Sequence, residues 1–257
     1  MRTDVVFNAF GSDLRQLLAI ARVVDESGFG ALWVNDHFSG AVLDAPWSRD
    51  PFVMLGAVAA ATERIDVGLL VANMMNRHPA QLASAANSVQ SLAPGRVRLG
   101  IGSGAAPGSR FAVEHEMIGT PLADSDGRLA MLRRYIADLR AMWKPDGRAP
   151  VGGVVDGAPM PQLIVGGSAW PTIEVAIEMA DGVNVRRTRR LAEHLAQIGA
   201  ADVGREFEVS VLDDHLDLDH PTGGAAADLA GVDRRLVTIS GDVDLATLRA
   251  FGERVRD

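Results

Sequence analysis

Two polar clusters in the sequence contain side chains that could move protons or bind a ligand. The first, Asn35-Asp36-His37, follows a short apolar run and places an imidazole, which can exchange a proton near pH 7, beside a carboxylate. Neighbouring side chains on an extended chain point to opposite faces, so we expect only one of the pair to face a pocket, and we favour His37. Structural roles are the alternative, with Asp36 capping a turn and His37 packing against Trp47.

The second cluster covers residues 73–79 and follows the apolar segment at residues 65–71. Arg77 could pair with an anionic group of a ligand, and Asn73 could donate hydrogen bonds to a planar heterocycle. In the structural alternative, Arg77 and His78 are turn residues that hold the helix after them. Both interpretations stay open at this point.

Two glycine-containing segments could also approach a ligand. Gly100-Ile101-Gly102-Ser103-Gly104 lacks the G-x-x-G continuation of a dinucleotide fingerprint, so its glycines are expected to bring backbone close to a ligand or to form a tight turn. Gly166-Gly167-Ser168 places a hydroxyl at the expected start of a helix, a geometry that binds phosphate but also occurs in ordinary capped turns.

Two histidines with acidic neighbours could ligate a metal ion. They are His115, between Glu114 and Glu116, and His215, in the acidic segment at residues 213–217. Neither spacing matches a known metal motif, and solvated acidic loops are more common, so we assign no metal.

The composition excludes several classes of protein. The chain of 257 residues has no cysteine, which removes disulfides, thiolate nucleophiles and cysteine-ligated metals. Its formal charge of −8 and lack of a long basic run argue against nucleic-acid binding. No stretch reaches the roughly 20 apolar residues that span a bilayer, and the first residues do not form a secretion signal. We therefore expect a cytoplasmic protein that does not bind membranes.

The apolar segments predict an alternation of strands and helices. Strands are expected at residues 4–9, 31–34, 65–71, 97–101, 162–165, 182–185, 206–212 and 236–239. Helices are expected between them: one capped by Ser12 and ended by Gly28, one starting at Asp50-Pro51, and others at residues 82–92, 129–143, 188–200, 224–230 and 245–255. A further helix is expected to be capped by Ser168. Residues 104–120 are expected to form a loop, and residues 144–160 are expected to form a long surface loop.

Eight strands that alternate with helices predict an α/β fold, a closed (β/α)8 TIM barrel in a single domain over residues 1–257. The carboxyl ends of the strands in such a barrel meet at one rim, where ligands bind. The clusters described above all follow strands, so we expect them to lie together on that rim.

Four segments, in this order, resemble the bacterial-luciferase-like family of flavin- and deazaflavin-dependent oxidoreductases. They are WVNDHF, DPFVMLGAVAAATERIDVG, RHPAQLASAANSVQSLAPGRVRLGIGSG and PQLIVGGSAWPTIEVAIEMADG. The resemblance is clearest over residues 31–105 and implies a barrel that binds its cofactor at the carboxyl rim, in agreement with the fold expected from the residue pattern.

The resemblance also implies roles for individual residues. The third strand would end in a backbone bulge, often with a non-proline cis peptide, around Leu70-Val71-Ala72, and this bulge would support the cofactor ring. Asn73 would contact the polar edge of the ring, and His37 would lie on the substrate side. Gly166 and Gly167 would hold the phosphate-bearing chain, and Gly102 and Ser103 are further expected cofactor contacts.

The Arg-His-Pro segment at residues 77–79 and the Asp36-His37 pair favour the branch of the family that uses the deazaflavin coenzyme F420 over the branch that uses FMN. The anionic tail of that coenzyme would need positive charge, for which Arg77, Arg110, Arg186 and Arg187 are candidates. The family resemblance also implies a homodimer.

Three functions are consistent with this resemblance. The first is an F420-dependent oxidoreductase that transfers hydride to or from a small organic substrate, with His37 as proton donor or orienting residue. The second is an FMN-dependent monooxygenase supplied with reduced flavin by a partner reductase. The third is a flavin-binding relative without turnover, because the chain is short for the family and Met74-Met75 replaces the usual proline and aromatic pair.

Overall fold

The computed structural model describes residues 1–143, 153–201, 203, 206–213, 229–239 and 241–255, and all structural statements concern these residues. Its strands are β1 (Arg2–Phe7), β2 (Ala31–Val34), β3 (Asp66–Asn73), β4 (Val97–Gly102), β5 (Gln162–Gly166), β6 (Gly182–Arg186), β7 (Glu208–Asp213) and β8 (Arg234–Ile239). Its helices are α1 (Leu14–Ser27), α2 (Pro51–Ala61), α3 (Pro79–Leu92), α4 (Val113–Met117), α5 (Ser125–Met142), α6 (Trp170–Met179), α7 (Leu191–Ala200) and α8 (Leu245–Val255).

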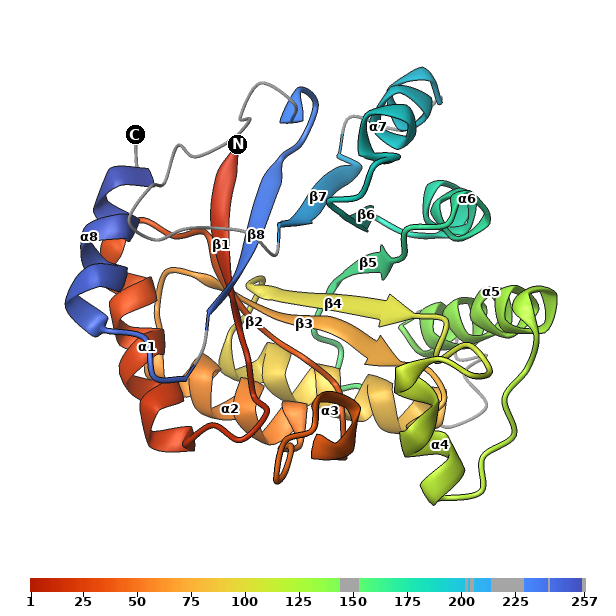
Figure 1. Cartoon of the computed structure of the whole chain (residues 1–257), viewed down its shortest axis with the longest axis horizontal. Coiled ribbons are helices and arrows are strands. Elements are labelled where there is room, and N and C mark those ends of the chain that lie inside the picture. The colour runs from red at the N-terminus through yellow and green to blue at the C-terminus, as the bar shows by residue number, and fades with distance from the viewer. Residues whose placement is uncertain (144–152, 202, 204–205, 214–228, 240, 256–257) are drawn as a thin grey trace.

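The strands form a closed parallel barrel in the order β1 to β8, with β8 paired to β1, and helices lie around its outside (Figure 1). The expected (β/α)8 barrel is confirmed. All carboxyl ends of the strands therefore lie at one rim, and α4 lies next to that rim, beyond the ends of β3 and β4 (Figure 1). None of the described helices is long and apolar enough to cross a membrane.

Several elements follow directly from local sequence chemistry. Asp50 caps α2 by accepting hydrogen bonds from the backbone N–H groups of Phe52 and Val53, and Pro51 occupies the first helical position. Asp25, in α1, accepts hydrogen bonds from the backbone N–H groups of residues 63, 64 and 65, and so fixes the chain just before β3. This contact sets the starting position of the strand that later forms one wall of the site.

The expected boundaries differ from the structure at several places. The cap of α1 is Asp13 rather than Ser12, α3 begins at Pro79 rather than at residue 82, and α7 begins at Leu191 rather than at residue 188. The segment expected to be a loop at residues 104–120 contains a short 3-10 helix, Arg110–Ala112, followed by α4. Most of the expected helix at residues 224–230 and part of the expected loop at 144–160 lie outside the described residues.

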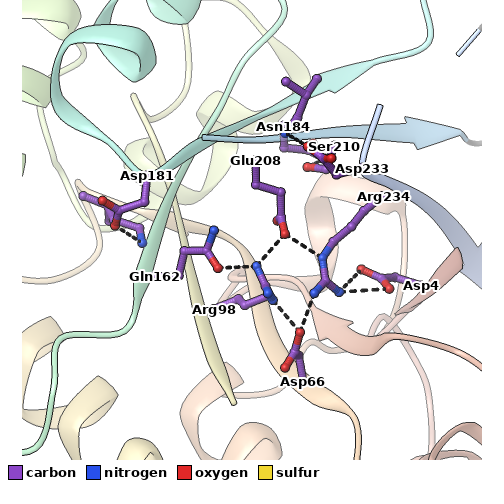
Figure 2. Close-up of polar contacts among 12 residues, drawn as sticks. Asp4, Asp66, Arg98, Gln162, Asp181, Asn184, Glu208, Ser210, Asp233 and Arg234 are labelled. Atoms are coloured by element: carbon purple, nitrogen blue, oxygen red, sulfur yellow. Dashed lines mark hydrogen bonds and ion pairs between the residues drawn. The ribbon is translucent and has the colours of Figure 1, made fainter. Parts of the chain in front are cut away.

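A network of charged side chains fills the barrel interior near the amino ends of its strands (Figure 2). The guanidinium group of Arg234 donates hydrogen bonds to Asp4 at 3.0 Å, to Glu208 at 2.7 Å, and to Asp66. Arg98 donates to Asp66 at 2.6 Å and to Glu208 at 2.7 Å. These residues come from five different strands, so the network connects opposite sides of the barrel.

Burial makes this network sensitive to the loss of a partner. The side chain of Arg234 is 2% exposed and that of Asp4 is fully buried. Burial raises the pKa of Asp4, and Arg234 partly offsets this effect. Removing one member of a buried ion pair leaves the other charge without compensation, which costs more than the pair itself contributes.

We therefore expect Arg234→Met to destabilise the protein by about 3–5 kcal/mol, because three buried or partly buried carboxylates lose a common partner. The measurement is the urea midpoint of the full chain. The control is Arg249→Met, which breaks the exposed pair with Glu26 and should cost about 1 kcal/mol or less. Equal losses in the two variants would contradict the structural role of the network.

Candidate functional site

A cavity of about 340 Å³ opens at the carboxyl ends of β2 to β5. Its lining comprises Asn35, Asp36, His37, Leu70, Val71, Asn73, Gly102, Ser103, Gly104, Ala105, Ala106, Ser109, Phe111, Gly166 and Arg186. A second cavity of about 190 Å³ shares several of these residues and extends to Gly167, Ser168 and Asn184. The polar clusters of β2 and β3 and both glycine segments therefore meet on one rim, as their positions after strands predicted.

The wall formed by β3 has an irregular backbone. The pairing register of β3 with β4 shifts between Leu69 and Ala72, and the peptide bond between Leu70 and Val71 is cis. The side chain of Asn35 donates a hydrogen bond to the backbone oxygen of Leu70 at 3.2 Å, which links this bulge to the end of β2. The bulge and the cis peptide expected from the family resemblance are thus present.

Glycines on the neighbouring strands accommodate the side chain of Val71. Gly102 in β4 pairs with Gly166 in β5. A Cβ atom at Gly102 would lie 2.6 Å from one methyl group of Val71, and a Cβ atom at Gly166 would lie 2.5 Å from the other. A Cβ at Gly100 would similarly lie 3.0 Å from Val71. These glycines give space to a side chain of the protein itself. Gly102 and Gly166 also line the cavity, so their expected contacts with a ligand stay a prediction.

Asp36 is buried and joins two strands. Its Oδ2 atom accepts hydrogen bonds from the backbone N–H of Asn73 at 2.9 Å and from the guanidinium group of Arg77 at 2.6 Å, while Oδ1 has no partner among the described residues. Burial raises the pKa of the Asp36 carboxyl, although Arg77 opposes this effect. Arg77 also pairs with Asp50 at 3.0 Å and does not line the cavity. Its side-chain contacts are structural, but they join Asp36 and the start of α2, whereas His78 is the residue that caps the following helix, α3.

His37 lies on the cavity wall with a carboxylate directly behind it. Its Nδ1 atom lies 2.8 Å from Oε2 of Glu114, whose other oxygen accepts the backbone N–H groups of Phe38 at 2.7 Å and Ser39 at 2.9 Å. Glu114 and its neighbour His115 are both 0% exposed. Interpreting this acidic segment as a solvated loop was therefore wrong, because α4 turns both side chains toward the barrel.

Two aromatic rings cover the imidazole of His37. Its ring centroid lies 5.2 Å from that of Phe10 and 5.7 Å from that of Phe111, the latter in a stacked arrangement. Trp47, the packing partner considered for His37 in the structural alternative, is instead 44% exposed. With Nδ1 in contact with Glu114, Nε2 is the imidazole nitrogen left to meet a ligand.

The amide of Asn73 is already engaged in the structure. Its Nδ2 atom lies 3.0 Å from Nε2 of His115, and its Oδ1 atom accepts the backbone N–H of Met75. Burial lowers the pKa of His115, so this imidazole is neutral and can accept a hydrogen from the amide. Asn73 still lines the cavity and keeps one amide hydrogen for a ligand.

The segment just before α6, residues 166–168, lines the other end of the combined cavities. The N-cap of this helix is Ala169, not Ser168 as the sequence predicted, and the Ser168 hydroxyl instead accepts the backbone N–H of Arg186 at 3.2 Å. The backbone N–H of Gly167 donates to Asn184 at 3.0 Å. The backbone N–H of Trp170 and the hydroxyl hydrogen of Ser168 remain as possible donors to an anion at this helix terminus.

The arginines considered for an anionic tail are not equally placed. The side chain of Arg186 lines both cavities. Arg187 instead pairs with Asp213 at 3.1 Å, and Arg110 donates a hydrogen bond to the backbone oxygen of Val42 at 2.9 Å. Ala72 is buried and, like Arg77, does not line either cavity. Arg186 is thus the candidate that the geometry favours.

Residues that the sequence did not single out complete the site. Glu114 had been considered only as a possible metal ligand, and Phe10, Asn35 and Phe111 had been given no specific contact. A further cavity of about 690 Å³ lies at the amino ends of β4 and β5 and is lined by residues such as Arg98 and Gln162. It contains none of the residues expected to bind cofactor.

The fit between Val71 and Gly166 leads to a prediction. Gly166→Ala should destabilise the protein by about 1–3 kcal/mol, because the added Cβ overlaps a methyl group of Val71. In a Val71→Ala background the same change should cost less than about 0.5 kcal/mol, since the overlapping group is gone.

The urea midpoint is measured for the wild type, for Gly166→Ala, for Val71→Ala and for the variant that carries both changes. Gly199→Ala is the matched control, because a Cβ at this position of α7 meets nothing within 4 Å. A cost for Gly166→Ala that is the same with Val71 and with Ala at position 71 would contradict the proposed packing.

Comparison with known proteins finds relatives whose sequences are similar to part of this chain. An F420-dependent glucose-6-phosphate dehydrogenase from Beutenbergia cavernae is 35% identical over 136 residues, which are 50% of this chain and 37% of the relative. A 5,10-methylenetetrahydromethanopterin reductase from Methanolobus tindarius is 26% identical over 195 residues, 72% of this chain and 56% of the relative. The chain thus spans less than two thirds of the length of either relative.

Solved structures share the fold. An F420-dependent secondary alcohol dehydrogenase in complex with an F420-acetone adduct has a TM-score of 0.76 at 16% identity, with all of both chains covered. The coenzyme F420-dependent tetrahydromethanopterin reductase from Methanopyrus kandleri has a TM-score of 0.72 at 15% identity, covering 98% of this chain and 97% of the other.

The match to a family model covers most of the site described above. The model describes luciferase-like monooxygenases and matches residues 3–212, which run from the second residue of β1 nearly to the end of β7 and include every residue that lines the two rim cavities. The family resemblance carried by the four sequence segments is confirmed. The chain belongs to the luciferase-like monooxygenase family.

Proposed function

We propose that this chain is an oxidoreductase that binds coenzyme F420 at the carboxyl rim of the barrel and transfers hydride between it and a small organic substrate. The observation that carries the proposal is the position of His37, which lines a cavity built around the β3 bulge. The names of relatives such as the F420-dependent dehydrogenase from Beutenbergia cavernae support the choice of coenzyme. The proposal concerns residues 1–257 as one barrel domain.

The residues of the rim fit the two chemically different parts of such a coenzyme. Val71 and the bulge around it would support the face of a planar ring, and Asn73 would donate its remaining amide hydrogen to the polar edge. The start of α6, Ser168 and Arg186 would hold the anionic chain, because a helix N-terminus and a guanidinium group both attract negative charge. The bound deazaflavin supplies the hydride acceptor or donor.

A residue of the chain accepts or donates the proton that the reaction releases or consumes. When an alcohol is oxidised, its hydroxyl hydrogen must leave as a proton while the carbon-bound hydrogen leaves as hydride. His37 is the residue on the wall that accepts this proton, and it returns the proton when a carbonyl compound is reduced. Asp36 acts indirectly in this proposal, through its contacts with the backbone of Asn73 and with Arg77.

The first experiment tests the coenzyme. The purified chain is titrated with F420 and separately with FMN, with fluorescence as the readout, and oxygen uptake is followed with the reduced forms. We expect F420 to bind, without oxygen consumption. Preferred binding of FMN with oxygen uptake would indicate the monooxygenase function of the family instead, and binding without any redox change would indicate a relative without turnover. No binding of F420 would contradict the proposal.

His37→Ala should leave F420 binding within about threefold of the wild type and lower turnover by about 100-fold or more, because the proton acceptor is lost. Turnover is measured with oxidised F420 and either 2-propanol or glucose 6-phosphate, whichever the wild type oxidises. His78→Ala is the control, because His78 caps α3 and lies outside both cavities. Full turnover by the His37 variant would rule out the assigned role.

We also propose that the chain forms a homodimer, as the family resemblance implied. Light scattering coupled to size-exclusion chromatography measures the mass in solution, and a monomer at micromolar concentration would contradict this part of the proposal.

A further inference from the structure

The Glu114 carboxylate contacts both a side chain and two backbone N–H groups, which is more than the capping of a backbone turn requires. It is fully buried on α4, yet it contacts three consecutive residues that follow β2. Oε1 accepts the backbone N–H groups of Phe38 and Ser39, so the segment after His37 is held by two hydrogen bonds. Oε2 is left for the imidazole alone.

We infer that Glu114 is a positioning residue that fixes the protonation pattern of His37, with the hydrogen on Nδ1 and an unprotonated Nε2 directed at the cavity. An ionised carboxylate can only accept hydrogen bonds. Its other two contacts are backbone N–H donors, so the carboxylate acts as an acceptor in both. The hydrogen in the 2.8 Å contact with His37 therefore belongs to Nδ1.

The surroundings of the imidazole keep this arrangement in place. Phe10 and Phe111 cover the ring at centroid distances of 5.2 and 5.7 Å, which restricts its rotation. The side chain of His37 is 21% exposed, whereas that of Glu114 is 1% exposed. The ring therefore meets the cavity along one edge while its opposite edge is held by a carboxylate away from water.

This inference rests on the proposed function for the fate of the proton. An unprotonated Nε2 can accept the hydroxyl proton of an alcohol while the carbon-bound hydrogen leaves with two electrons for the coenzyme. The O–H and C–H bonds break, a C=O double bond forms, and Nε2 gains the proton. The positive charge that results lies beside Glu114, which stabilises it.

Other ionisable groups near His37 are already compensated or neutral. Asp36 is paired with Arg77, and burial lowers the pKa of His115 so that it carries no charge near neutral pH. Among the described residues, Glu114 is the carboxylate in hydrogen-bond contact with the imidazole. A change in the protonation pattern of His37 on substitution of Glu114 can therefore be assigned to the loss of that contact.

Glu114→Gln provides the test. Its side-chain oxygen can still accept the N–H groups of Phe38 and Ser39, but its amide would donate a hydrogen to Nδ1 and so move the imidazole hydrogen to Nε2. Glu116→Gln is the matched control, because Glu116 lies on the same helix with an exposed side chain.

The readout is the ¹⁵N NMR spectrum of the cofactor-free protein labelled at its six histidines, recorded from pH 6 to pH 9. Signals of His37 are assigned by their loss in His37→Gln. We expect an unprotonated Nε2 in the wild type and in Glu116→Gln at the upper end of this range, and a protonated Nε2 in Glu114→Gln. A wild-type Nε2 that is protonated throughout would overturn the inference, as would an unchanged spectrum in Glu114→Gln.

The test depends neither on the folding of Glu114→Gln nor on the proposed function. The wild-type spectrum is informative even if Glu114→Gln does not fold, which its urea midpoint reveals. F420 binding by Glu114→Gln is expected to stay within about threefold of the wild type, because Glu114 does not line the cavity. A wild type that binds no F420 would contradict the proposed function, whereas the spectrum alone decides the tautomer.

Discussion

The carboxylate of Asp36 is the contact on which the geometry of the rim depends. It binds the backbone N–H of Asn73 and the guanidinium group of Arg77, and so joins the end of β2 to the end of β3. Arg77 extends the connection to Asp50 at the start of α2, and its backbone oxygen accepts the hydroxyl of Tyr135 in α5. One buried charge thus holds two strands and two helices in a fixed relation.

This arrangement explains why the irregular part of β3 has a defined shape. The bulge at Val71 is held from the β2 side by Asn35 and ends at Asn73, whose backbone is bound by Asp36. Its inward side chain fills the space left by Gly102 and Gly166. The cavity wall therefore results from packing and hydrogen bonds within the protein.

Much of this architecture could be predicted from the sequence because it follows from local patterns. Unbroken apolar runs predicted buried parallel strands, and their number predicted a closed barrel with all carboxyl ends on one rim. Asp50-Pro51 predicted the start of α2 correctly because capping depends on residues close in sequence. The bulge and cis peptide around Val71 came from the family resemblance, not from the residue pattern.

The contacts that complete the site could not be predicted in the same way, because they join residues distant in the sequence. Glu114 lies 77 positions from His37, and an acidic segment gives no local sign that it will be buried against that imidazole. Ser168 resembles a helix cap, but its hydroxyl accepts the backbone N–H of Arg186 from the next strand instead. The role of Gly166 likewise depends on Val71, which approaches it only in the closed barrel.

A crystal structure of this chain with coenzyme F420 would show directly whether one rim holds both the coenzyme and the proton acceptor. We predict that the deazaflavin ring lies against Val71, that the anionic chain lies near Ser168 and Arg186, and that Nε2 of His37 faces the reactive side of the ring. Binding in the cavity of about 690 Å³ at the amino ends of β4 and β5, or a ring that does not contact Val71, would contradict this prediction.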